Sequence, residues 1–114
     1  MVEVKILEHL TKFDPDDKKN IVRIKDYFYF RNHLWIVFEM LSYNLYEFIK
    51  SNHFNGFSLS LTRRFAIQIL ISLIYMREHA IVHWDLKPEN ILLRKPNKSG
   101  IKLIDFGSSW FEPE

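Results

Sequence analysis

The chain has 114 residues, a formal net charge of +2 and no cysteine. This length allows one domain at most, the charge is too small to indicate nucleic-acid binding, and the composition excludes disulfides and thiolate metal sites. Uninterrupted apolar runs are too short for a membrane span or a signal peptide, so we expect a soluble protein inside the cell, bound to neither nucleic acid nor membrane.

Residues 1–11 predict an amphipathic helix, because Val2, Ile6, Leu7 and Leu10 recur at helical spacing. No capping residue precedes the first apolar position, so we expect the chain to begin inside a helix. Taken alone, Glu3 is a solvated helix carboxylate.

A polar loop at 13–20 leads toward two predicted strands, at 27–30 and 34–39, joined by a turn at 31–33. The aromatic residues of these strands could indicate base stacking on an open sheet. Because no basic groove accompanies them, we expect them to pack in a core instead.

A short helix is predicted at 43–50 and a long one at 59–79, the latter with Ser58 or Ser60 as its N-cap. Several apolar side chains of the long helix share one broad face, which we expect to lie in the core: Phe65, Ala66, Ile69, Leu70, Leu73 and Ile74.

Turn-forming residues at 95–100 separate two short β-type runs, 91–94 and 101–104, which predicts a hairpin. Antiparallel pairing brings Asn90, before the first strand, beside Asp105, after the second. Their side chains should then lie roughly 5 Å apart, close enough to share metal ions.

The run His83 to Asn90 (HWDLKPEN) follows a short predicted strand at 81–82 and precedes the hairpin and Asp105-Phe106-Gly107. This series resembles the catalytic and magnesium loops of protein kinases and is far more specific than a single short motif. The resemblance implies an α+β, kinase-like two-lobe fold that is partly represented. The C helix and two strands of the small lobe would occupy 1–39, the hinge 39–42, and the large-lobe helices, catalytic loop and hairpin 43–114.

The resemblance further implies ATP and Mg²⁺ as cofactors and protein substrates as partners. Asp85 would orient the acceptor hydroxyl and take its proton, while Lys87 would stabilise the transferred phosphoryl group. Asn90 and Asp105 would hold the magnesium ions, whose preference for oxygen ligands suits these two side chains.

The same resemblance assigns a nucleotide site. Phe38 would close the back of the adenine pocket, the backbone of Glu39 and Leu41 would hydrogen-bond the adenine edge, and Leu92 would form the floor. Glu3 would pair with a phosphate-binding lysine of the small lobe. His83 is expected to be a structural hydrogen-bonding residue.

Local sequences at 30–34, 37–46 and 105–109 are similar to the dual-specificity tyrosine-regulated kinases (DYRK family), and this likeness extends from Glu3 to Trp110. It implies phosphorylation of Ser and Thr, tyrosine autophosphorylation, and a cytoplasmic or nuclear location. Trp84 departs from the arginine of most kinases, so it cannot bind an activation-loop phosphate.

The three tryptophans, at 35, 84 and 110, fall where this family tends to have cysteine. We hypothesise that they are cysteines read with the wrong genetic code, which mass spectrometry of residues 81–87 would test. A genuine Trp84 would have to be absorbed beside the site, at an overpacking cost of about 1–3 kcal/mol.

Two other function classes remain open. A kinase-like scaffold without catalysis is the main alternative, and a metal-dependent hydrolase using His83, Asp85 and Asp105 is a distant one. Only two residues precede Glu3, so we expect these 114 residues alone to lack the Gly-rich loop and strand lysine of a kinase and to be inactive.

Overall fold

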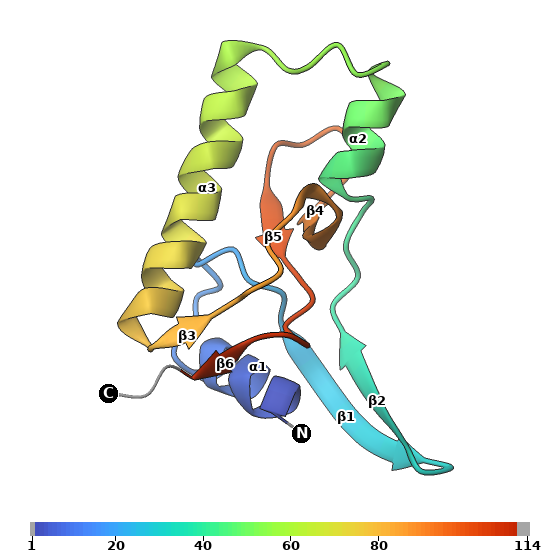
Figure 1. The fold of residues 1–114 in the computed structure, drawn as a ribbon, viewed down its shortest axis with the longest axis vertical. Coiled ribbons are helices and arrows are strands. Elements are labelled where there is room, and N and C mark those ends of the chain that lie inside the picture. The colour runs from blue at the N-terminus through green and yellow to red at the C-terminus, as the bar shows by residue number, and fades with distance from the viewer. Residues whose placement is uncertain (1, 112–114) are drawn as a thin grey trace.

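The computed structural model describes residues 2–111 and contains both helices and short strands (Figure 1). In chain order these are α1 (Val2–Lys12), β1 (Ile24–Phe30), β2 (His33–Phe38), α2 (Leu45–Ser51), α3 (Leu59–Glu78), β3 (Ile81–Val82), the 3-10 turn η1 (Pro88–Asn90), β4 (Ile91–Leu93), β5 (Ile101–Leu103) and β6 (Trp110–Phe111). The mixture confirms the α+β class.

Helix α1 buries Val4, Ile6, Leu7 and Leu10. The predicted apolar stripe was right at 6, 7 and 10 but wrong at Val2, which is 56% exposed. Val4 takes its place because it lies one turn before Leu7, whereas Val2 sits in the outermost turn.

Strands β1 and β2 form an antiparallel hairpin in which Phe30 pairs with His33. The two loop residues, Arg31 and Asn32, have φ of 52° and 64°, as a tight type I′ hairpin turn requires. The predicted turn is confirmed, but the first strand begins at Ile24, three residues before its predicted start.

The aromatic residues of this hairpin are not in a core, which corrects our expectation. Phe28, Tyr29, Phe30 and Trp35 remain about half exposed. Two strands make a sheet that is too small to bury both faces, and the described residues do not cover these rings.

Helix α3 begins at its cap Ser58, whose hydroxyl accepts a hydrogen bond from the Leu61 amide at 3.2 Å. Its buried residues are Phe65, Ser72, Tyr75 and Met76.

The prediction for this helix was right at Phe65 and at Ile69, which is half-buried against the core. It was wrong at three exposed residues, Ala66, Leu70 and Ile74. Two polar residues explain the difference. Ser72 donates to the Lys19 carbonyl at 2.7 Å, and Gln68 accepts from the Ile101 amide at 2.9 Å. The face of α3 that contacts the rest of the chain is thus partly polar. A prediction based only on the apolar residues therefore placed the buried face incorrectly.

By length and composition, α3 is also the one helix in the described part of the chain that could cross a membrane, with a mean hydropathy of 1.3. Arg63, Arg64 and Arg77 interrupt its apolar pattern, so the expected lack of a membrane span stays a prediction. Such a helix is weak evidence for a span, since core helices of soluble proteins meet the same test.

The predicted hairpin after η1 is confirmed: β4 and β5 pair antiparallel, with Ile91 opposite Leu103. The predicted strand at 81–82 is also present as β3. Its partner β6 was not foreseen and pairs with it antiparallel.

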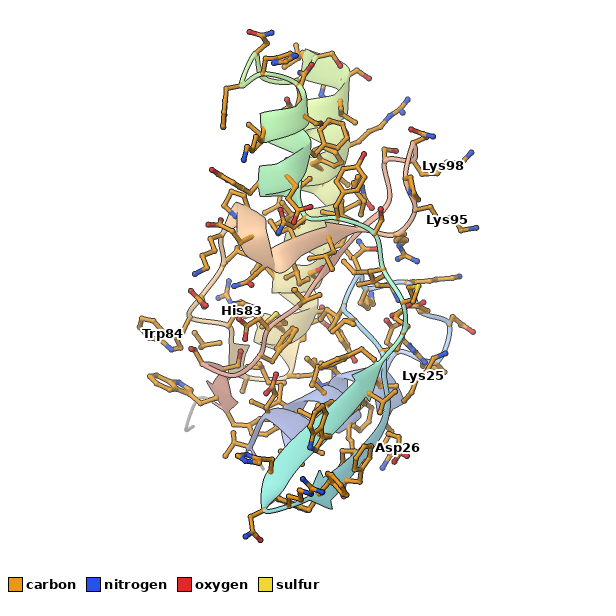
Figure 2. The ribbon with its side chains drawn as sticks, turned by 90° about the vertical axis from the view of Figure 1, so that its right-hand side faces the viewer. Lys25, Asp26, His83, Trp84, Lys95 and Lys98 are labelled. Atoms are coloured by element: carbon orange, nitrogen blue, oxygen red, sulfur yellow. The ribbon has the colours of Figure 1, made fainter. Side chains whose placement is uncertain are left out.

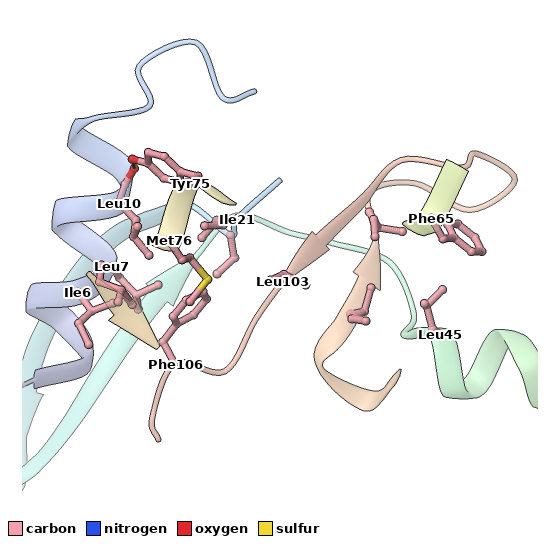
Figure 3. Packing of buried hydrophobic residues seen from close by; sticks show 14 of the residues in the cluster. Ile6, Leu7, Leu10, Ile21, Leu45, Phe65, Tyr75, Met76, Leu103 and Phe106 are labelled. Atoms are coloured by element: carbon pink, nitrogen blue, oxygen red, sulfur yellow. Dashed lines mark hydrogen bonds between the residues drawn. The ribbon is translucent and has the colours of Figure 1, made fainter. Parts of the chain in front are cut away.

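The core runs between α1, α3 and this second hairpin. Figure 3 shows Phe106 and Met76 gathered against Ile6 and Leu7 at one end, while Leu45 and Phe65 pack around the hairpin at the other. Helix α1 and the segment that follows β5 are therefore fixed to each other through Phe106, which is 1% exposed.

Candidate functional site

His83 connects two loops that are distant in sequence. Its Nε2 lies 2.8 Å from the Ile104 carbonyl oxygen, and its Nδ1 accepts a hydrogen bond from the Asp85 amide at 3.1 Å. Nε2 must therefore carry the proton in this arrangement. The ring is 4% exposed and meets Phe106 edge to face, with 4.8 Å between centroids. These contacts suit the structural role predicted for His83.

Asp85, Lys87 and Asn90 form one cluster. The Asn90 amide nitrogen donates to the Asp85 carbonyl at 2.8 Å and to its carboxylate Oδ2 at 3.2 Å. Lys87 Nζ lies 3.6 Å from Asp85 Oδ1. One carboxylate thus faces an amide and an ammonium, and the Asn90 side-chain oxygen remains the atom suited to a metal ion.

Asp105 follows β5 on the neighbouring side of the hairpin. The Ile104 amide donates to the Asn90 carbonyl at 2.9 Å, so the hairpin brings the backbone before Asp105 next to Asn90. The predicted approach of the two side chains stays a prediction. The φ of Asp105 is 61°, a left-handed conformation that Asp adopts more readily than most residues. The Gly107 amide makes a long contact of 3.4 Å with its Oδ1.

A pocket of about 370 Å³ opens beside Asp105, a volume in the range of small-molecule sites. Most of its lining was predicted as the nucleotide site, and two residues were missed. The lining residues are Glu3, Val22, Phe38, Glu39, Leu41, Leu92, Ile104 and Asp105. The missed residues are Val22 and Ile104. Val22 precedes the first strand and Ile104 directly precedes the predicted metal ligand Asp105, and these positions were the signals available.

The predicted residues thus fall into two adjoining groups. Asp85, Lys87 and Asn90 belong to the hydrogen-bonded cluster and do not line the pocket, whereas Asp105 lines the pocket and joins the two groups through the hairpin. A polar cluster beside an apolar cavity can hold a ligand that has a flat apolar part and a charged part.

Glu3 lies next to Asp105 although 102 positions separate them in sequence. Burial, followed by the negative charge of Asp105, raises the pKa of Glu3, and a hydrogen bond from the Phe106 backbone opposes this shift. A cation entering between these two carboxylates would be favoured, which fits the lysine partner expected for Glu3.

The described residues contain no group of three or more His, Cys, Asp or Glu side chains that could hold a metal. The two candidate ligands, Asn90 and Asp105, offer an amide oxygen and a carboxylate. Oxygen donors of this kind suit Mg²⁺ better than zinc, because Mg²⁺ takes one or two protein oxygens and completes its shell with water and phosphate. Asn90 and Asp105 are the residues that would hold it.

Trp84 points outward from the loop, on the opposite side of the ribbon from the Lys95 and Lys98 side chains (Figure 2). It is 63% exposed and lies 5.1 Å from the Trp110 ring, centroid to centroid. The predicted overpacking is therefore wrong, because solvent accommodates the indole. Its φ of 68° is unfavourable for a bulky residue and marks a strained loop at the site.

Known proteins and a known family are similar to this chain in sequence. The family model described as "Protein kinase domain" matches residues 1–112. The chain is 60% identical over 114 residues to a probable serine/threonine-protein kinase, dyrk2, of Dictyostelium discoideum, covering all of this chain and 12% of that protein. It is 53% identical over 112 residues to dual specificity tyrosine-phosphorylation-regulated kinase mbk-2 of Caenorhabditis elegans, covering 98% of this chain and 14% of the relative.

For dual specificity tyrosine-phosphorylation-regulated kinase 4 of Homo sapiens the identity is 52% over 112 residues, which are 98% of this chain and 22% of the human protein. The chain thus spans between about an eighth and a fifth of the length of these relatives. Together with the catalytic-loop cluster and the pocket, these matches show that the chain belongs to the protein kinase family and, within it, is similar to the dual-specificity tyrosine-phosphorylation-regulated kinases.

Proposed function

We propose that the protein carrying this chain transfers the terminal phosphoryl group of ATP to Ser and Thr residues of protein substrates, with Mg²⁺ as cofactor. The observation that carries the proposal is the cluster of Asp85, Lys87 and Asn90 beside a pocket that contains Asp105. The names of the similar proteins, a probable serine/threonine-protein kinase and a dual specificity tyrosine-phosphorylation-regulated kinase, support protein phosphorylation. Tyrosine autophosphorylation is a further part of the proposal.

In this proposal Phe38 and Leu92 would hold the nucleotide base in the pocket, and the peptide groups of Glu39 and Leu41 would hydrogen-bond its edge. Asp105 would lie on the side of the triphosphate. Because the lining residues that the structure describes include acids but no base, a bare triphosphate would be repelled there. Asn90 and Asp105 would hold Mg²⁺, which would compensate the charge of the triphosphate.

Asp85 acts on the acceptor. Its carboxylate is held by Asn90 and remains partly exposed, with 35% of its side chain accessible. It orients the incoming hydroxyl and takes its proton, while Lys87 places a positive charge beside the moving phosphoryl group.

The test uses the protein expressed from its complete natural reading frame. Asp85→Asn should lower turnover by about 10²–10⁴-fold and leave nucleotide affinity nearly unchanged, because its role is at the acceptor. The matched control is Asp16→Asn, which alters an exposed carboxylate in the loop after α1. Lost nucleotide affinity with unchanged turnover would contradict this division of roles.

The alternative is a kinase-like scaffold that binds partners without catalysis. It predicts a stable protein with no release of ADP above that of the Asp85→Asn variant. A hydrolase would instead cleave esters without nucleotide.

We also propose a cytoplasmic or nuclear location, to be tested by imaging a tagged protein at its natural expression level. A label confined to a membrane would contradict it. Imaging also tests whether α3, which is long and apolar enough to span a bilayer, places the protein in a membrane.

A further inference from the structure

Lys102 is a buried cation that the proposed mechanism does not use. It lies in the middle of β5, three residues before Asp105, and is 1% exposed. Lysine is almost never buried to this degree unless its ammonium is paired. Here Nζ lies 2.8 Å from both carboxylate oxygens of Asp17 and 2.5 Å from Glu39 Oε2.

Glu39 connects this cation to the pocket, which it lines. Its carboxylate Oε2 also accepts the Arg23 amide at 2.8 Å, and its own amide donates to the Arg23 carbonyl at 3.2 Å. Glu39 is therefore held by its backbone and its side chain together. A shift of its peptide group would break the contact with Lys102.

The other end of the same linker is fixed independently. The Ser42 amide donates to the Leu93 carbonyl at 2.8 Å. Between the two anchors lie Met40, which is 93% exposed, and Leu41, which lines the pocket. Lys102 and the Leu93 carbonyl thus hold the two ends of the segment that faces the nucleotide.

We call the Lys102 ammonium with its two carboxylate partners, Asp17 and Glu39, the clamp. Asp17 connects it to the loop after α1. Its carboxylate lies about 4 Å from Arg23 and Arg94 as well, and these cations are more exposed than Lys102. Without the Lys102 ammonium, the half-buried carboxylates of Asp17 and Glu39 would face each other with no cation between them. Like charges in such a site repel, so Glu39 would have to move or rotate away.

We propose that Lys102 is a positioning residue for nucleotide binding: its ammonium, shared by Asp17 and Glu39, fixes the peptide groups of residues 39–41 at the pocket wall. This role rests on the proposed function. A buried ion pair adds little net stability over a well-packed apolar side chain, and a defined geometry is what it supplies here.

Lys102→Met removes the charge and keeps the length of the side chain. In the protein from its complete reading frame, we expect the KM and the dissociation constant for ATP to rise about tenfold and kcat to change less than about twofold, as for lost uniform binding. Lys95→Met is the matched control, because Lys95 is exposed on the same hairpin and points away from it (Figure 2). A folded Lys102→Met protein with the parent's affinity would overturn the proposal.

Hydrogen exchange of the unliganded protein gives a readout that needs no activity. Backbone amides of the segment 39–42 should exchange at least about tenfold faster in Lys102→Met than in Lys95→Met, because the clamp no longer opposes local opening. Unchanged exchange in a folded variant would contradict the clamp. If the parent binds no nucleotide, the proposed function is wrong. Hydrogen exchange of residues 39–42 then still tests whether Lys102 holds this segment.

Glu39→Gln serves as a second variant should Lys102→Met fail to fold. Its neutral amide can still accept the Arg23 amide but holds the ammonium weakly. It should raise exchange and the ATP dissociation constant in the same direction. If both remain at parental values, the proposal is wrong.

Discussion

Asp105 combines a left-handed backbone conformation with a charge that lies next to Glu3. Its φ of 61° is tolerated by Asp and Asn alike, so replacing it with Asn preserves the conformation and removes only the charge. We expect Asp105→Asn to lower Mg²⁺-dependent phosphoryl transfer at least about a hundredfold, since a neutral amide cannot compensate a hard dication.

The measurement is ADP release as a function of magnesium concentration. Asp26→Asn is the control, because Asp26 is exposed on the β1–β2 hairpin and lies outside the pocket. Transfer near the parental rate at ordinary magnesium would remove Asp105 from the metal site.

At the residue scale, the sequence predicted the hairpin that carries Asn90 and Asp105, whereas the roles of these two side chains stay predictions. Asn90 and Asp105 could be paired because a hairpin has one simple register. Lys102 was missed, because nothing local distinguishes a buried lysine from an exposed one in a strand. Its partners, Asp17 and Glu39, come from two other segments.

At the element scale, α1 and α3 meet through a histidine pair. His9 Nε2 lies 2.9 Å from His79 Nδ1, at the end of α3. Burial, then the charges of His79 and Lys12, lower the pKa of His9. Neutral His9 is therefore favoured in the folded state, and two protonated imidazoles could not form this hydrogen bond.

The sign of the pH effect follows from this shift. A base whose pKa is lowered by folding adds stability above its unfolded pKa, and this stability is lost as the pH falls through the folded value. We expect the melting temperature to fall between pH 7 and pH 5, more steeply for the parent than for His9→Gln. His53→Gln, in the exposed loop between α2 and α3, should keep the parental slope.

If His9→Gln and the parent showed equal slopes, the pair would not be the titrating element.

Helix α3 shows why element boundaries were predicted better than buried faces. Its cap and ends could be read locally, from Ser58 and the length of the apolar pattern. Its orientation depended on where Gln68 and Ser72 found backbone partners, in β5 and in the loop before β1. Those partners are 33 and 52 or more positions away, so local periodicity does not contain the information.

At the scale of the whole molecule, large apolar surfaces remain uncovered by the described residues. One lies on α3, where Leu59, Leu70 and Ile74 are each more than half exposed, and the other is the aromatic hairpin β1–β2. Apolar patches of this kind mark surfaces that bind another protein segment or cause association.

We therefore expect the 114 residues, expressed alone, to self-associate and to transfer no phosphate to a peptide. Leu70→Lys should weaken association because it places a charge within the apolar face of α3, whereas Thr62→Lys adds the same charge at an exposed polar position of that helix and should not. Sedimentation velocity at several concentrations measures the difference. Equal sedimentation of the two variants would exclude the α3 face as the contact. A monomeric, cooperatively melting chain that phosphorylates a peptide from Mg²⁺-ATP would show that these apolar surfaces need no cover and that the pocket needs no further cation.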